Sequence, residues 1–138
     1  MRYIIGVKDA TAKLERPLEM RLLTNDNFCQ LTGEDATVAA FLAQGGHGCI
    51  SVSANVAPAL SAKLHQAWQN KNFNDFNYYR DLLMPIHDAM FCRPSPAPAK
   101  YALSLLGKCT PYARLPITPC DEMAKKQIEN ALKHAKLL

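Results

Sequence analysis

The first half of the chain alternates between short apolar, strand-like segments and amphipathic, helix-like segments. In chain order these five segments are residues 3–8, about 14–24, 28–32, 34–44 and 48–53. Consecutive strands that are joined by helices lie parallel and connect through right-handed crossovers. The pattern therefore predicts an α/β fold with at least three parallel strands.

The alternation ends after a third helical pattern at about residues 58–70, and the chain is helical from there on. The predicted helices of this second part span residues 73–91, 100–106 and 121–136. Pro85 lies inside the first of them, so we expect a kink there or a break after Met84. These patterns predict two domains: residues 1–71 with the strands and their helices, and residues 72–138 as a helical domain.

Composition and charge argue against several classes of partner. Hydrophobic residues make up 49% of the 138 residues and charged residues 20%, which is typical of a globular chain. The net charge is +4, and no basic stripe interleaved with aromatic residues is present, so nucleic acid is not an expected partner. No apolar run is long enough to span a bilayer, and no secretory signal pattern is found, so we expect no membrane partner.

The cysteines and histidines do not form a recognisable metal site. The five cysteines contain no C-x-x-C pair, and neither they nor the four histidines fall at zinc-ligand spacings. Without a secretory signal, this pattern predicts reduced thiols and a cytoplasmic location.

Lys8 ends the first predicted strand and is the candidate catalytic residue. Alternate side chains of a strand share a face, so Gly6 and Lys8 point the same way, and the glycine leaves room for a small molecule beside the amine. Desolvation at the end of a buried strand favours the neutral form of an amine, which can form a Schiff base with a carbonyl substrate. The alternative interpretation of this one residue is a lysine that ends a strand in water.

Six sequence blocks, in order and from end to end of the chain, support the first interpretation. They are residues 6–11 (GVKDAT), 31–36 (LTGEDA), 45–57 (GGHGCISVSANVA), 83–87 (LMPIH), 94–100 (PSPAPAK) and 114–119 (RLPITP). This ordered set resembles the dihydrodipicolinate synthase family, part of the pyruvate-dependent aldolase superfamily. The resemblance covers only the C-terminal half of a family member, and Met1 falls where the sixth barrel strand begins.

The resemblance implies a barrel fold of which this chain supplies only a part. It implies the C-terminal part of a (β/α)8 TIM barrel, with strands six to eight and their helices, followed by a helical C-terminal domain. A complete barrel takes roughly 250 residues, so we expect either a truncated product or a half that is supplied separately. Three strands leave two open edges, so we expect a homo-oligomer, pairing with a complementary N-terminal half, or marginal stability.

The resemblance also implies a reaction. Lys8 forms an imine with pyruvate, Ile50 borders the pyruvate through its backbone, and Gly33 leaves space in the pocket. For Gly33 a tight turn between strand and helix is an equally good explanation. The pyruvate enamine then adds to aspartate semialdehyde, which leads to hydroxy-tetrahydrodipicolinate, a precursor of diaminopimelate and lysine, and no metal or organic cofactor is implied.

Several departures from the family leave alternatives open. The catalytic tyrosine, the threonine of the proton relay and the arginine that binds the aldehyde substrate belong to the half that the resemblance does not cover. Arg93 and Ser95 stand where the family usually has an acidic residue and an asparagine. The alternatives are a catalytically inactive half-barrel, or another pyruvate-dependent aldolase such as a sialic acid or keto-deoxy sugar lyase.

Overall fold

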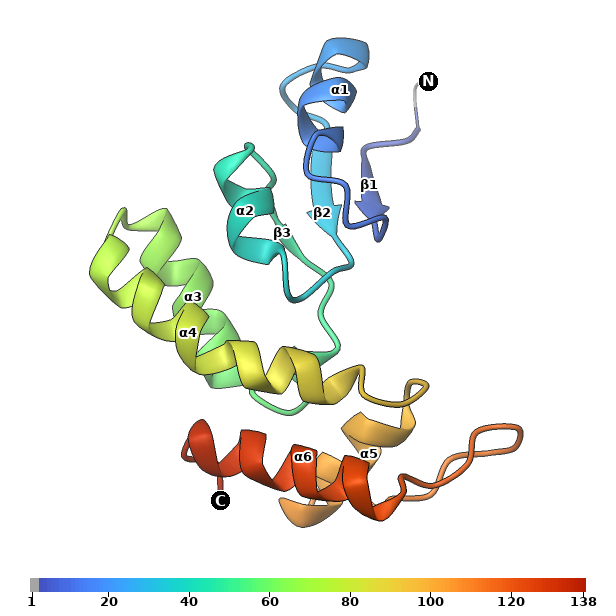
Figure 1. Ribbon diagram of the computed structural model, residues 1–138. Helices are drawn as coiled ribbons and strands as arrows, with labels where there is room; N and C mark the ends of the chain where they lie inside the picture. Colours follow the sequence, from blue (N-terminus) through green and yellow to red (C-terminus); the bar gives the residue numbers. More distant parts are fainter. Residues whose placement is uncertain (1–2) are drawn as a thin grey trace. The chain divides into compact units, whose positions relative to one another are not determined.

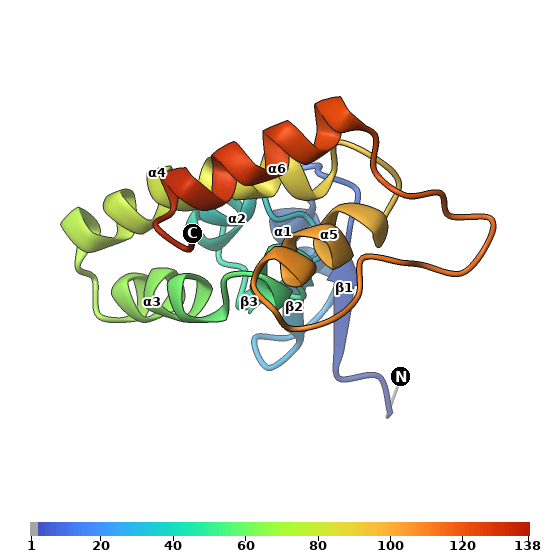
Figure 2. The same cartoon turned by 90° about the horizontal axis from the view of Figure 1, so that it is seen from below.

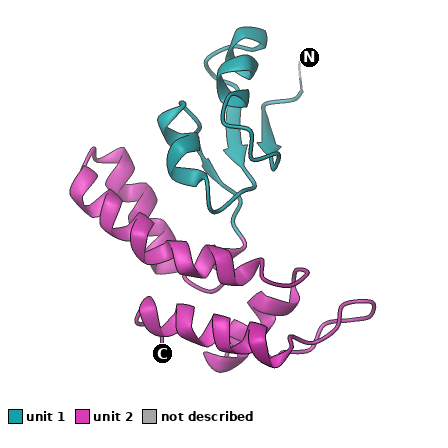
Figure 3. Cartoon of the chain, viewed as in Figure 1, with its two compact units in different colours: residues 1–51 teal, residues 52–138 magenta. Residues whose placement is uncertain are grey.

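The computed structural model describes residues 3–138 (Figure 1), and Figure 2 shows the same elements from below. The chain divides into two compact units, Met1–Ser51 and Val52–Leu138 (Figure 3). Met1, at which the resemblance sets the start of a barrel strand, lies outside the described residues. The two units meet after Ser51, earlier than the boundary predicted near residue 71. That boundary separates barrel elements from a helical domain, and it stays a prediction.

Unit 1 holds three parallel strands and two helices, as the sequence predicts. Its elements are β1 (Gly6–Asp9), α1 (Arg16–Leu23), β2 (Cys29–Thr32), α2 (Val38–Ala43) and β3 (Gly48–Cys49). The strand order is β1-β2-β3, and both neighbouring pairs are parallel. Lys8 is opposite Leu31, and Leu31 is opposite Gly48. The carboxyl ends of all three strands therefore meet at one edge of the sheet.

Local hydrogen bonds set the limits of the elements in unit 1. The strands are shorter than predicted, since β1 begins only at Gly6 and β3 ends at Cys49. Helix α2 starts at Val38 and not directly after Gly33, because the Thr32 hydroxyl accepts the Glu34 N–H (3.0 Å) and holds a turn there. The helix ends at Ala43, and the predicted breaker Gly45 follows with a φ of +89°, which favours glycine.

Much of the apolar surface of helix α1 is not covered within the described chain. Leu22 is 88% exposed and Leu23 80% exposed, whereas the core of the unit comes from Val38, Phe41 and Leu42 of α2. A cavity of about 650 Å³ lies between β1 and α1. Leu22 and Leu23 therefore form exposed apolar surface on α1, of the kind that marks interaction sites on proteins.

Unit 2 is built from helices that match the predicted ones. Its elements are the short 3₁₀ helix η1 (Ser53–Asn55), α3 (Pro58–Gln69), α4 (Phe73–Met90), α5 (Ala97–Leu105) and α6 (Glu122–His134). Helices α3 and α4 lie side by side, and α4 also packs against α6 (Figures 1 and 2). Helix α5 begins three residues earlier than expected, because Pro98 fits the first turn of a helix.

The predicted break after Met84 is wrong, because α4 runs through Pro85 without interruption. Proline removes one backbone hydrogen bond, but Leu83 and Ile86 on either side of it are fully buried. Burying large apolar side chains stabilises each turn by about 1.5–3 kcal/mol per side chain, which is enough to keep the helix continuous.

Two polar contacts tie the elements of unit 2 together. The ring Nδ1 of His87 in α4 lies 2.8 Å from the hydroxyl of Ser53 in η1, and both side chains are buried. Asp121 caps α6 by accepting the N–H of Ala124 (2.8 Å), and Arg93 donates to the same carboxylate through Nε (2.9 Å) and Nη2 (2.6 Å). Arg93 thus has an acidic partner in this chain.

No helix within residues 3–138 is both long and apolar enough to cross a membrane.

Candidate active site at the ends of the strands

The three predicted site residues lie at the carboxyl ends of three neighbouring strands. Lys8 lies in β1, Gly33 directly follows β2, and Ile50 directly follows β3. The Gly33 N–H donates to the Asp9 carbonyl (2.7 Å), and the Ile50 N–H donates to the Thr32 carbonyl (2.8 Å). These bonds extend the sheet by one residue at each strand end, so the sheet brings all three positions to one edge.

The stem of Lys8 crosses the neighbouring strand at Gly33. A Cβ atom added to Gly33 would lie 2.5 Å from Cε of Lys8 and 2.8 Å from Cβ of Ala10. Both distances are shorter than any ordinary contact between carbon atoms. A Cβ atom at this position would therefore displace the lysine stem or Ala10, which gives the glycine a second explanation beside a tight turn.

The loop that follows Lys8 is held by Asp9. One carboxylate oxygen accepts the N–H of Thr11 (2.8 Å) and its hydroxyl (2.6 Å), and the other accepts Nε–H of Arg16. Burial acts to raise the pKa of Asp9, but the hydrogen bonds from Thr11 and Arg16 outweigh it and lower the pKa. Asp9 is therefore a carboxylate at neutral pH, next in sequence to the candidate lysine.

Sequence reasoning missed Cys49, whose thiol belongs to the same edge. Its Sγ lies 3.8 Å from the carboxylate of Asp35. Burial raises the pKa of Cys49 to about 12, Asp35 adds to the increase, and the charge of Lys8 acts against it. The thiol is therefore protonated at neutral pH. The sequence did offer a signal, because Cys49 directly precedes Ile50 in the glycine-rich block.

The surroundings of Lys8 differ from the sequence prediction. Lys8 is exposed and Ile50 is 49% exposed, so the expectation of a half-buried amine is wrong for this chain. The reason is that three strands form an open sheet, whereas a closed barrel encloses the side chains at the end of each strand. The lysine stem lies close to Gly33, directly after β2, but unit 1 by itself does not shield the amine from water.

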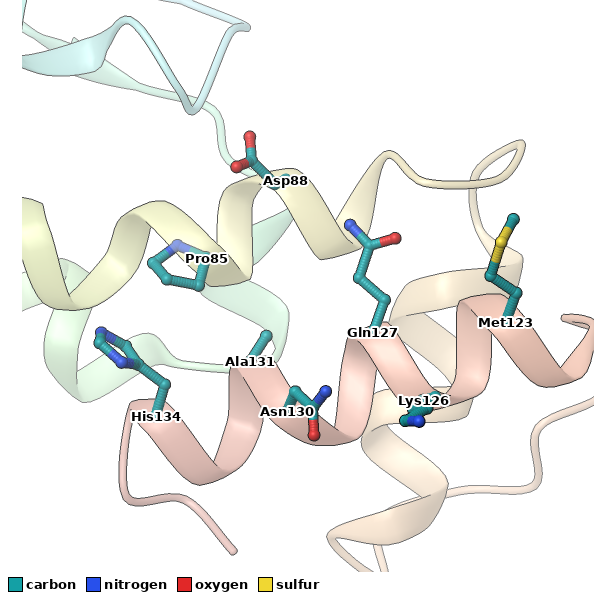
Figure 4. A pocket seen from close by; sticks show the side chains of 8 residues that line it. All are labelled: Pro85, Asp88, Met123, Lys126, Gln127, Asn130, Ala131 and His134. Atoms are coloured by element: carbon teal, nitrogen blue, oxygen red, sulfur yellow. The ribbon is translucent and has the colours of Figure 1, made fainter.

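Another groove lies in unit 2, between α4 and α6. It has a volume of about 510 Å³ and is lined by Pro85, Asp88, Met123, Lys126, Gln127, Asn130, Ala131 and His134. In Figure 4, Gln127 reaches from α6 toward α4, whereas Asn130 points away from α4. The groove contains none of the predicted site residues. Within residues 3–138, no group of three or more His, Cys, Asp or Glu side chains is arranged to hold a metal ion.

Comparison with known proteins assigns the chain to a family. The model of the dihydrodipicolinate synthetase family matches residues 1–135. The chain belongs to this family. A 4-hydroxy-tetrahydrodipicolinate synthase from Rhodospirillum centenum is 53% identical over 135 residues, and one from Gluconacetobacter diazotrophicus is 50% identical over 136 residues. The match covers 98% of this chain in both cases, but 46% of each relative, so the chain spans about half the length of these curated relatives.

Solved structures of the dihydrodipicolinate synthetase family agree with the fold. The dihydrodipicolinate synthase of Thermotoga maritima matches 97% of this chain with a TM-score of 0.91 and 29% identity, and the match covers 46% of that protein. The chloride-inhibited enzyme of Acinetobacter baumannii, solved in complex with pyruvate, matches 98% with a TM-score of 0.89 and 30% identity, again over 46% of its length.

Proposed function

We propose that this chain is the lysine-bearing part of a 4-hydroxy-tetrahydrodipicolinate synthase. Lys8, packed over Gly33 at the carboxyl end of β1, is the observation that carries this proposal. Barrel enzymes place their chemistry at the carboxyl ends of their strands. The names of the curated relatives and the pyruvate complex of one similar structure support pyruvate as the first substrate.

The chemistry begins with Lys8. Its neutral amine attacks the keto carbon of pyruvate, water leaves, and an imine forms. Loss of a proton from the pyruvate methyl group gives an enamine, whose carbon adds to the aldehyde of aspartate semialdehyde. Cyclisation onto the imine carbon then releases the Lys8 amine and the cyclic product. In this proposal the Ile50 backbone borders pyruvate.

The remaining parts of the enzyme follow from the family. Residues 1–71 contribute barrel strands six to eight with their helices, and residues 72–138 form the helical C-terminal domain. The outer edge of β1 and the exposed face of α1 take up a complementary N-terminal half or a second copy of the chain. This assembly supplies the acid–base groups, which typically accelerate such steps by ~10²–10⁴-fold, and it shields the amine from water.

The direct test is reductive trapping. Incubation of the chain with pyruvate and borohydride is expected to add one reduced pyruvate to Lys8, located by peptide mass spectrometry. The Lys8→Ala variant is expected to lose this adduct, and Lys13→Ala, which removes an exposed lysine of the same loop, is expected to keep it. If the parent chain gains no adduct at Lys8, the proposed chemistry does not belong to this chain.

The second candidate is a catalytically inactive half-barrel, and the exposure of Lys8 favours it. The two candidates separate when the chain is mixed with the N-terminal half of a related synthase. Synthase activity that depends on both pieces and on Lys8 supports the enzyme, and assembly without activity supports the structural role.

A further inference from the structure

The loop between β1 and α1 is closed by a single carboxylate. Thr11 donates both its N–H (2.8 Å) and its hydroxyl (2.6 Å) to one oxygen of Asp9, and Arg16 donates to the other. Arg16 is the first residue of α1. The carboxylate therefore joins the end of the strand, the loop and the start of the helix at the residue that follows Lys8.

This clamp fixes a residue that lies beside Gly33, as the lysine stem does. Ala10 stands between the clamped residues Asp9 and Thr11, and its Cβ shares the space above Gly33 with Cε of Lys8. Gly33 is itself fixed by the hydrogen bond from its N–H to the Asp9 carbonyl (2.7 Å). Ala10 and the Lys8 stem thus lie beside the same glycine, and the clamp holds the loop that carries Ala10.

We propose that Asp9 and Thr11 are positioning residues for Lys8. Neither side chain touches the reacting carbon, and both act by holding Ala10 and the strand end against the lysine stem. Directing the amine is most important where the side chain is otherwise open to water, as it is here. The inference rests on the proposed imine chemistry and adds to it the residues that aim the nucleophile.

The competing explanation is that the clamp only stabilises the fold. Thr11 is exposed, and one hydrogen bond of an exposed loop residue contributes little to stability, so a large effect on reactivity at unchanged stability separates the two explanations. Thr11→Val removes the hydroxyl donor but keeps the size, shape and charge of the side chain, and Thr11→Ser restores the donor. Thr24→Val is the matched control, because the Thr24 hydroxyl donates to the Met20 carbonyl (2.7 Å) in the same unit.

The experiment measures borohydride trapping of pyruvate on the full chain at several pyruvate concentrations and pH values. Thr11→Val is expected to lower the maximal trapping rate about tenfold, since misplacement by 1 Å can cost ~100-fold. The pH midpoint of trapping is expected to stay unchanged, because no charge is removed. Thr11→Ser should restore the rate, and Thr24→Val should keep it, with the melting temperature of each variant measured in parallel.

Each outcome decides the inference. An unchanged maximal rate in Thr11→Val, or an equal loss in Thr24→Val, overturns the positioning role while the proposed function stands. A loss that follows the melting temperature and is not rescued by Thr11→Ser also overturns it. If the parent chain itself is not trapped at Lys8, both the positioning role and the proposed function fail.

Discussion

Replacing Gly33 by alanine tests the packing of the lysine stem most directly. The added methyl carbon would lie 2.5 Å from Cε of Lys8 and 2.8 Å from Cβ of Ala10. An ordinary carbon contact is about 3.5 Å or longer, so the lysine stem must move by about 1 Å. The flexible stem yields more easily than Ala10, whose loop is held by Asp9.

A displacement of this size predicts a large loss of reactivity with a small loss of stability. Misplacement of a reacting group by 1 Å can cost ~100-fold in rate, and overpacking costs about 1–3 kcal/mol when the surroundings cannot adjust. We therefore expect Gly33→Ala to reduce the rate of pyruvate trapping at Lys8 by between ten- and a hundredfold, roughly. The free energy of unfolding, measured by urea titration, is expected to fall by about 1 kcal/mol.

Gly48→Ala is the matched control, because it adds a methyl group to the same sheet. Its added carbon would lie 3.3 Å from Cδ2 of Leu31, the movable end of a flexible side chain, and far less adjustment is needed there. We expect Gly48→Ala to keep the trapping rate. A Gly33→Ala chain that is trapped as fast as the parent would refute the argument that the lysine lies against this glycine.

Two further predictions concern charge states. Hydrogen bonds from the N–H of Ala124 and from Arg93 lower the pKa of Asp121 below its ordinary value of 3.8. The Asp121 carboxylate therefore stabilises the fold above pH 3.8, and this contribution is lost as the pH falls through the lowered pKa. We expect Asp121→Ala to lower the midpoint of urea unfolding at neutral pH and to differ less from the parent in strong acid. Burial raises the pKa of Cys49 from 9.0 to about 12, which reduces its thiolate fraction on the order of 10³-fold. We expect iodoacetamide at mildly alkaline pH to label the exposed Cys109 well before Cys49, measured by peptide mass spectrometry. Equal labelling rates of the two cysteines would contradict the raised pKa of Cys49.

The arrangement of the strands could be predicted from the sequence because the pattern is local. Apolar runs alternate with amphipathic helices, and that order alone predicts parallel strands whose carboxyl ends meet. Lys8, Gly33 and Ile50 consequently lie at one edge, as predicted. The limits of the elements depended on single hydrogen bonds, such as the one from the Glu34 N–H to Thr32, which a hydrophobic pattern does not reveal.

The surroundings of the candidate site could not be predicted in the same way. Whether Lys8 is buried depends on whether further strands cover the end of β1, and the open three-stranded sheet within residues 3–138 has none there. The break expected after Met84 as one of two outcomes at Pro85 is wrong for a related reason: the local rule does not count the burial of Leu83 and Ile86, which keeps the helix continuous. Cys49 was overlooked because its raised pKa depends first on burial and then on the carboxylate of Asp35, and neither is visible in the local sequence.

The hydrogen bond between His87 and Ser53 helps to fix the position of helix α4 along its axis relative to η1. Apolar side chains recur along α4 every three or four positions, so a slide by one turn would bring Leu83 close to where Ile86 or His87 packs and lose little apolar contact. The same slide would carry Nδ1 of His87 about 5.4 Å from the serine hydroxyl and break a buried polar bond. Apolar packing thus holds α4 against its neighbours, and the hydrogen bond between His87 and Ser53 favours one position of the helix along its axis.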